Sequence, residues 1–111
     1  MESILFSEFQ KLDMRVGKVV SAERVEGSRH LLKLAVDFGS EGGKLQAVSG
    51  IGEQYVPDDL IGKKFMFILN LERKKFMGVE SQCMIFAAED GKGTISLMVP
   101  LKDVKEGSKV H

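Results

Sequence analysis

The chain has 111 residues, of which 43% are hydrophobic and 29% charged, and its formal net charge is zero. This length suits one domain with one core, and the composition excludes a disordered chain. The zero net charge excludes a general attraction to nucleic acid, and the single cysteine excludes an internal disulfide and a thiolate zinc site. Without a long apolar run or a basic leader, we expect a cytoplasmic protein with neither a membrane span nor a signal peptide.

The predicted elements are mainly strands, beginning after a short helical turn at residues 7–12. A first strand is expected at 14–25, where Gly17 marks a bulge that lets a long strand curl. Residues 32–38 place apolar side chains at every second position. This alternation predicts a second strand with one face in a core.

Five further elements follow along the chain. A third strand is predicted at 44–51, and the acidic stretch 57–60 begins with proline, as short helices often do. The fourth strand, at 63–71, is apolar on both faces, so both faces must be covered. Strands at 84–88 and 94–99 flank an acidic, glycine-rich turn and predict a hairpin.

Five main strands, a curling first strand and a short helix between strands three and four predict an all-β fold. The pattern matches a small five-stranded Greek-key barrel of the oligonucleotide/oligosaccharide-binding type, the OB-fold. We expect a single domain over residues 1–111, with residues from about 100 to 111 as a C-terminal extension. This tail either adds a short strand or packs against a partner subunit.

The loop at residues 70–84 is the best candidate for a functional surface. Residues 37–62 carry one Lys and five Asp or Glu, a net charge of 1 − 5 = −4, whereas residues 63–75 carry five Lys or Arg and one Glu, a net charge of 5 − 1 = +4. The loop combines cations for phosphates, polar groups for base edges and apolar groups for stacking. The alternative is a solvated basic hairpin whose Phe76 and Met77 cover the barrel core.

Residues for catalysis or metal binding are scarce. A Cys83 nucleophile with His30 as its base is conceivable, but nothing near Cys83 in the sequence would stabilise a thiolate. The glycine-rich stretch at 49–52 lacks the context of a dinucleotide-binding turn. We therefore predict no catalytic residues, no metal site, no cofactor and no enzymatic activity.

Five segments, in order, carry a resemblance to a known family. They are residues 13–19, 34–39, 47–51, 55–63 and the loop with Asn70, Lys75 and Gly78-Val79-Glu80-Ser81-Gln82. Together they resemble the tRNA-binding domain found as free-standing dimers and as appendages of methionyl-tRNA and other aminoacyl-tRNA synthetases. The resemblance implies an OB-fold homodimer that binds tRNA by backbone and shape. It also implies a role as an accessory (beta) subunit, or a trans-acting homologue, of the methionyl-tRNA synthetase C-terminal domain.

The predicted RNA-binding residues combine positions carried over from the family's signature loop with nearby cations. They are Asn70, Arg73, Lys74, Lys75, Ser81, Gln82, Met84, His30 and Lys33. The chain departs from the family at His30, which replaces a lysine, and at Cys83, which stands where glycine is usual. A largely neutral histidine would weaken the phosphate contact expected there or move it to Arg29 or Lys33.

Two other interpretations stay open on the sequence. The same fold occurs in secretion chaperones, so a dimer that binds peptides along Met66, Phe76 and Met77 is the main alternative. A purely structural adaptor for a synthetase is the second. The unbroken motifs at 48–50 and 78–82 favour tRNA binding.

Overall fold

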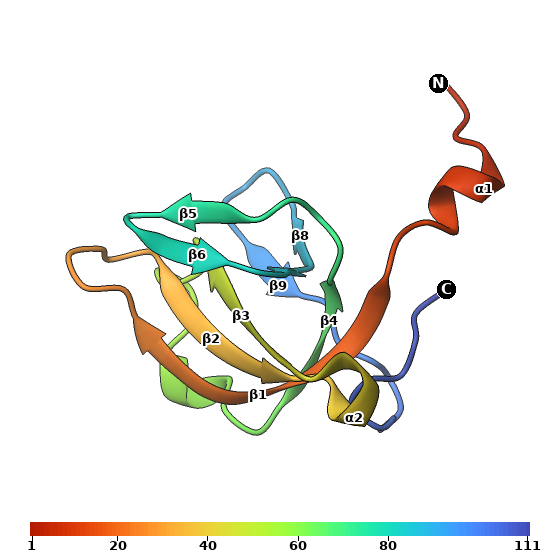
Figure 1. Cartoon of the computed structure of the whole chain (residues 1–111). Coiled ribbons are helices and arrows are strands. Elements are labelled where there is room, and N and C mark those ends of the chain that lie inside the picture. The colour runs from red at the N-terminus through yellow and green to blue at the C-terminus, as the bar shows by residue number, and fades with distance from the viewer.

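Five antiparallel strands wrap into a barrel in the computed structural model, which describes residues 1–111 (Figure 1). They are paired in the order β3-β2-β1-β4-β7. Ala47 of β3 forms a parallel bridge with Cys83 just before β7, and the Gln82 N–H donates to the Gln46 carbonyl at 2.8 Å, which nearly closes the barrel. The predicted OB-like all-β fold is confirmed. The barrel strands are β1 (Met14–Arg24), β2 (Leu32–Asp37), β3 (Lys44–Ser49), β4 (Lys64–Ile68) and β7 (Met84–Ile85).

Shorter elements decorate this barrel. The predicted turn between strands three and four is one turn of 3-10 helix, η1 (Pro57–Asp59), and Gly62 follows it with a φ of 84°. Two small hairpins stand outside the main sheet, and a short helix that the sequence did not predict joins β2 to β3. The remaining elements are α1 (Phe6–Phe9), α2 (Gly39–Gly42), β5 (Lys74–Phe76), β6 (Val79–Ser81), β8 (Ala87–Glu89) and β9 (Ile95–Leu97).

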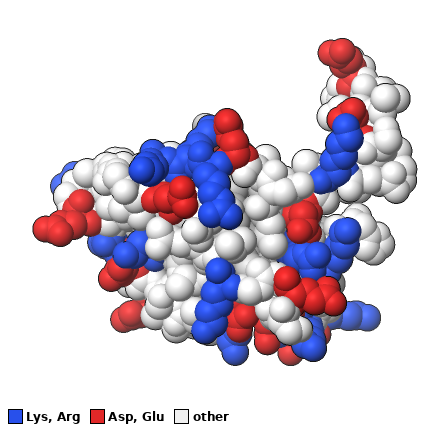
Figure 2. All heavy atoms as spheres, in the orientation of Figure 1, with Lys and Arg blue, Asp and Glu red and all other residues white.

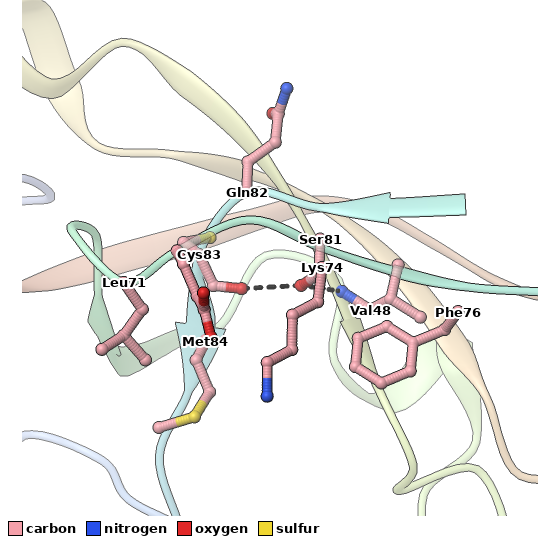
Figure 3. Close-up of a pocket in the computed structure, with 9 residues that line it drawn as sticks. Val48, Leu71, Lys74, Phe76, Ser81, Gln82, Cys83 and Met84 are labelled. Atoms are coloured by element: carbon pink, nitrogen blue, oxygen red, sulfur yellow. Dashed lines mark hydrogen bonds between the residues drawn. The ribbon is translucent and has the colours of Figure 1, made fainter. Parts of the chain in front are cut away.

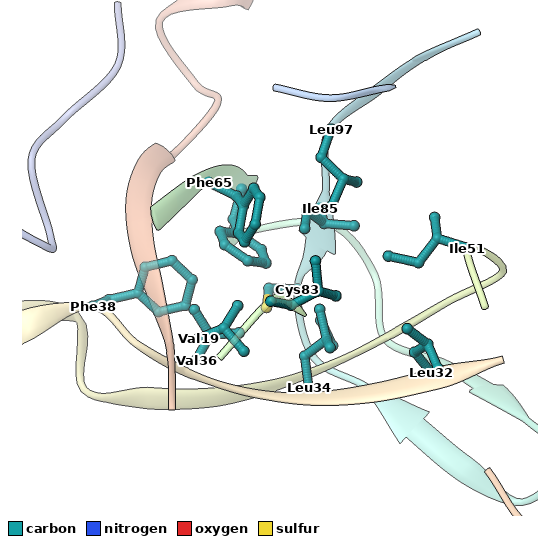
Figure 4. Close-up of a cluster of buried hydrophobic side chains, with 13 residues drawn as sticks. Val19, Leu32, Leu34, Val36, Phe38, Ile51, Phe65, Cys83, Ile85 and Leu97 are labelled. Atoms are coloured by element: carbon teal, nitrogen blue, oxygen red, sulfur yellow. The ribbon is translucent and has the colours of Figure 1, made fainter. Parts of the chain in front are cut away.

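The core is one cluster of 13 buried side chains that point into the barrel from all of its strands (Figure 4). The alternating residues of β2 supply Leu32, Leu34 and Val36, each fully buried, as the sequence pattern predicted. Phe38 and Phe67 meet edge to face, with ring centroids 5.3 Å apart. This rigid interior supports the loops that leave the barrel ends.

Gly17 has a different role from the predicted one. The register of β1 against β2 shifts between Val19 and Ser21, so the bulge lies three residues further along. A Cβ at position 17 would lie 2.5 Å from Cγ1 of Val36 and 2.6 Å from Cε1 of Phe38. Glycine is therefore needed for close packing across the barrel rather than for a bend.

The strands predicted at 63–71 and 84–88 do not run unbroken over those residues. The fourth strand ends at Ile68 rather than at residue 71, and Leu71 is 43% exposed. The expected strand at 84–88 is interrupted at Phe86, which separates β7 from β8. The N–H of Phe86 donates to the Met66 carbonyl, the N–H of Met66 donates to the Met98 carbonyl, and the N–H of Met98 donates to the Phe86 carbonyl. Residues 86 and 98 therefore lie along the edge of β4 that also pairs with β7.

The C-terminal tail packs against its own barrel. Gly107 donates to the Val16 carbonyl at 2.7 Å, Val16 donates to Ser108, and Val110 donates to Met14. Lys64 holds the same tail through Asp103, with Nζ 2.8 Å from the carboxylate, an arrangement that raises the pKa of Lys64. The tail thus pairs with the first residues of β1 along the same edge that β2 uses further on, as a short added strand would.

The N-terminal segment, by contrast, stands away from the barrel (Figure 1). Its helix α1 is only four residues long and buries none of them. Ile4, Leu5 and Phe6 are exposed by 80%, 69% and 70%. No helix of the structure has the length and apolar character needed to cross a membrane.

Candidate nucleic-acid interface

The predicted functional loop folds as a two-stranded hairpin, β5–β6, across one end of the barrel (Figure 1). Met77 and Gly78 form its two-residue turn, with φ angles of 50° and 82°, and tight hairpins need positive values at both positions. The Met77 side chain lies beside Gly27 in the β1–β2 loop, because a Cβ there would be 3.4 Å from its Cε. The hairpin tip is thereby seated on the neighbouring loop.

Strand geometry distributes the three adjacent cations over the two faces of the hairpin. Lys74 and Phe76 lie on one face and Lys75 on the other, because successive side chains alternate. Lys74 and Lys75 form no ion pair, whereas Nη1 of Arg73 lies 3.6 Å from Oε1 of Glu80. Lys and Arg atoms gather over this hairpin in Figure 2, with acidic side chains beside them. The hairpin therefore presents a lysine on each face, with Glu80 opposite Lys75 and beside Arg73 as the acidic residue of the second face.

Ser81 and Gln82 bond the hairpin to the barrel. The buried hydroxyl of Ser81 donates to the Cys83 carbonyl at 2.8 Å and accepts from the Val48 N–H at 2.9 Å (Figure 3). Oε1 of Gln82 accepts from the Gln46 N–H at 2.9 Å. Nε2 of Gln82 donates to Oε1 of Glu80 at 3.5 Å. Both residues belong to the predicted site, and their side chains are engaged with β3 and with neighbouring residues of the hairpin and of the chain before β7.

Asn70 is similarly engaged, at the other end of the loop. Its Oδ1 accepts from the Asp13 N–H at 2.8 Å, and its Nδ2 donates to the Lys11 carbonyl at 2.6 Å. These two bonds join the chain after β4 to the chain before β1. Asn70 therefore holds the base of the loop in place.

Lys33 and His30 belong to β2 and to the loop before it rather than to the hairpin. Lys33 shares a shallow groove with Met77 and Val79, but its Nζ is 2.7 Å from Oε1 of Glu23 on the paired strand. His30 is exposed, and its Nδ1 lies 4.0 Å from Oε1 of Glu53. Each lies within 4.0 Å of a carboxylate, whereas Lys74 and Lys75 form no ion pair.

A cavity of about 270 Å³ opens beneath the hairpin (Figure 3). Four predicted site residues line it, namely Lys74, Ser81, Gln82 and Met84. Met84 is 44% exposed, so it is not a core residue. Sequence reasoning missed several lining residues, because only the folded chain brings β3 and the start of the loop to this place. The cavity is lined by Val48, Leu71, Glu72, Lys74, Phe76, Ser81, Gln82, Cys83 and Met84.

The geometry opposes a cysteine nucleophile. Cys83 is 5% exposed, and desolvation by burial raises the pKa of its thiol to about 12. The thiol faces the Gln46 carbonyl, with Sγ 3.8 Å from the oxygen. A neutral buried thiol is inert, so Cys83 acts as a small core residue.

Comparison with known proteins adds to this geometry. A family model described as "Putative tRNA binding domain" matches residues 14–109. The chain belongs to this tRNA-binding domain family. It is 53% identical over its full length to a methionine–tRNA ligase of Methanocaldococcus jannaschii, but it spans only 17% of that enzyme.

Two solved structures cover nearly all of the chain. A MetRS-related protein from Pyrococcus horikoshii has a TM-score of 0.92 and 43% identity, with 100% of each chain covered. The chaperone CsaA from Bacillus anthracis has a TM-score of 0.90 and 30% identity, covering 99% of this chain and 100% of its own. The tRNA-binding domain family thus shares its fold with a chaperone.

Proposed function

We propose that this tRNA-binding domain is a non-catalytic module that binds tRNA through its phosphate backbone and folded shape. The observation that carries the proposal is the anchored β5–β6 hairpin, on which neither Lys74 nor Lys75 forms an ion pair, although Glu80 lies opposite Lys75. A rigid hairpin holds these charges at fixed positions, and phosphate contacts position a protein on nucleic acid without reading its sequence. Family membership and the MetRS-related structure support the same conclusion.

A salt titration tests the phosphate contacts. Removing one lysine–phosphate interaction should flatten the log–log dependence of tRNA affinity on salt by roughly 0.7 to 0.9. Lys74→Ala and Lys75→Ala should each weaken binding and reduce the slope by this amount. Lys92→Ala is the matched control, because Lys92 is an exposed lysine in the β8–β9 turn with no ion pair. If all three variants bind like the parent, the hairpin is not the RNA-binding surface.

The proposal includes a cytoplasmic homodimer that assists a methionyl-tRNA synthetase. Support for the dimer comes from the N-terminal arm, residues 1–12, where Phe6 and Phe9 stack with centroids 6.0 Å apart outside the barrel. An exposed apolar surface of this kind usually marks an interaction site. Sedimentation at micromolar concentration should give a dimer for the parent and a monomer for Phe6→Ser. A monomeric parent would refute this part of the proposal.

Peptide binding is the second candidate function. It is favoured by the CsaA likeness and by the exposed Phe76 and Met84 at the rim of the cavity. Titrating labelled tRNA and a labelled apolar peptide in one buffer separates the two functions. We expect tRNA to bind and the peptide not to compete, and the opposite result would replace the first proposal by the second.

A further inference from the structure

The cavity beneath the hairpin has a buried floor and an exposed rim. Val48, Ser81 and Cys83 form the floor and are at most 9% exposed. Phe76 and Met84 are exposed by 37% and 44% at the rim, and in Figure 3 the Lys74 side chain lies between them. Such a site suits a ligand with a flat apolar body and a polar edge.

The floor has no hydrogen-bonding group to offer. The Ser81 hydroxyl already bonds Val48 and Cys83, and no buried side-chain nitrogen or oxygen lacks a partner. Discrimination among ligands therefore depends on the rim. Two charged side chains line it, Glu72 and Lys74.

A surface that binds only phosphates has no use for the acidic side chain of Glu72. It directly precedes Arg73, Lys74 and Lys75, and its charge repels phosphate. It forms no ion pair, whereas Glu80 on the same hairpin lies beside Arg73. Glu72 is exposed and its side chain has no donor within the protein, so it is available to accept a hydrogen bond from a ligand in the cavity that it lines.

A nucleobase supplies both the flat body and the donor. Cytosine, adenine and guanine carry exocyclic amino groups, and Glu accepts from such groups. Uracil has none. Unpaired bases stack on aromatic side chains, and the flexible methionine side chain can pack against the ring of a base. An apolar peptide side chain would match the floor but would leave Glu72 and Lys74 without partners.

We propose that this cavity holds one unpaired nucleobase with an exocyclic amino group. Glu72 accepts a hydrogen bond from that amino group, Lys74 binds the adjoining phosphate, and Phe76 and Met84 contact the ring. The proposal rests on the proposed tRNA binding and adds a base preference to it. Glu72 thereby determines specificity while contributing unfavourably to overall charge attraction.

Single-stranded RNA octamers of cytidine and uridine test the preference, because the two bases have the same size. Fluorescence anisotropy should show that oligo-C binds about fivefold more tightly than oligo-U, the ratio of affinities that corresponds to about 1 kcal/mol. Glu72→Gln removes the charge and should bind both octamers more tightly. Its amide can accept from the cytosine amino group but can equally donate to a uracil carbonyl, so the ratio of the two affinities should fall close to one. Glu80→Gln is the matched control: it removes the same charge from the other face of the hairpin and should keep the parent ratio.

The proposal is wrong if the parent binds tRNA but does not distinguish the octamers, or if Glu72→Gln keeps the preference. In either case the proposed tRNA binding stands. If the parent binds neither tRNA nor octamers, both proposals fall. Amide chemical shifts of Cys83 and Met84 locate the ligand: oligo-C should move them, and movement with an apolar peptide alone would assign the cavity to peptides instead.

Discussion

Replacing Ser81 by alanine separates a structural role from a direct contact with RNA. The buried hydroxyl accepts from the Val48 N–H at 2.9 Å and donates to the Cys83 carbonyl at 2.8 Å. Ser81→Ala leaves a buried N–H without a partner, which costs about 1–3 kcal/mol. A loss of about 2 kcal/mol should lower Tm by roughly 8 °C in a domain near this size.

Urea unfolding followed by circular dichroism measures this loss. The midpoint should fall without a change in the m-value, because the variant buries the same surface. Ser96→Ala is the matched control, since Ser96 is an exposed β-strand serine. Unchanged stability in Ser81→Ala together with weaker tRNA binding would refute the reasoning, and would make Ser81 an RNA contact instead.

Two further predictions concern packing and ionisation. Gly17→Ala should destabilise the domain by about 1–3 kcal/mol in the same urea assay, because the alanine Cβ would overlap the side chains of Val36 and Phe38. An unchanged free energy of unfolding would contradict the close packing at this position. Cys83 should resist iodoacetamide in the native state until pH approaches its pKa of about 12, and alkylation at pH 9 without unfolding would contradict its burial. Because the folded pKa lies above the unfolded value of 9.0, the thiol's contribution to stability should be complete below pH 9 and fall between pH 9 and 12.

The barrel could be predicted from sequence because its signals are local. Alternation at residues 32–38 reports one buried face, and that face contains Leu32, Leu34, Val36 and Phe38 in the folded chain. The sequence predicts a bulge at Gly17, because the residues that pack against this glycine in the folded chain are distant in sequence. No local pattern reveals such a close approach.

The candidate site was only partly predictable for a related reason. Composition identified the cations of the loop, since charge is visible in the sequence. Composition could not show whether the polar groups of Asn70, Ser81 and Gln82 face a ligand or the protein. Asn70 bonds the chain before β1, and Ser81 and Gln82 bond β3, so these partners are distant in sequence and meet only in the folded chain. Glu72 was overlooked because one acid among cations looks like ordinary surface charge.

The two bonds of Asn70 have a mechanical consequence. One side-chain amide joins segments 57 and 59 residues apart, linking the base of the N-terminal arm to the start of the cationic loop. The arm cannot swing at its base without releasing that loop. A partner that binds the arm would therefore also restrict the motion of the cationic loop and of its hairpin.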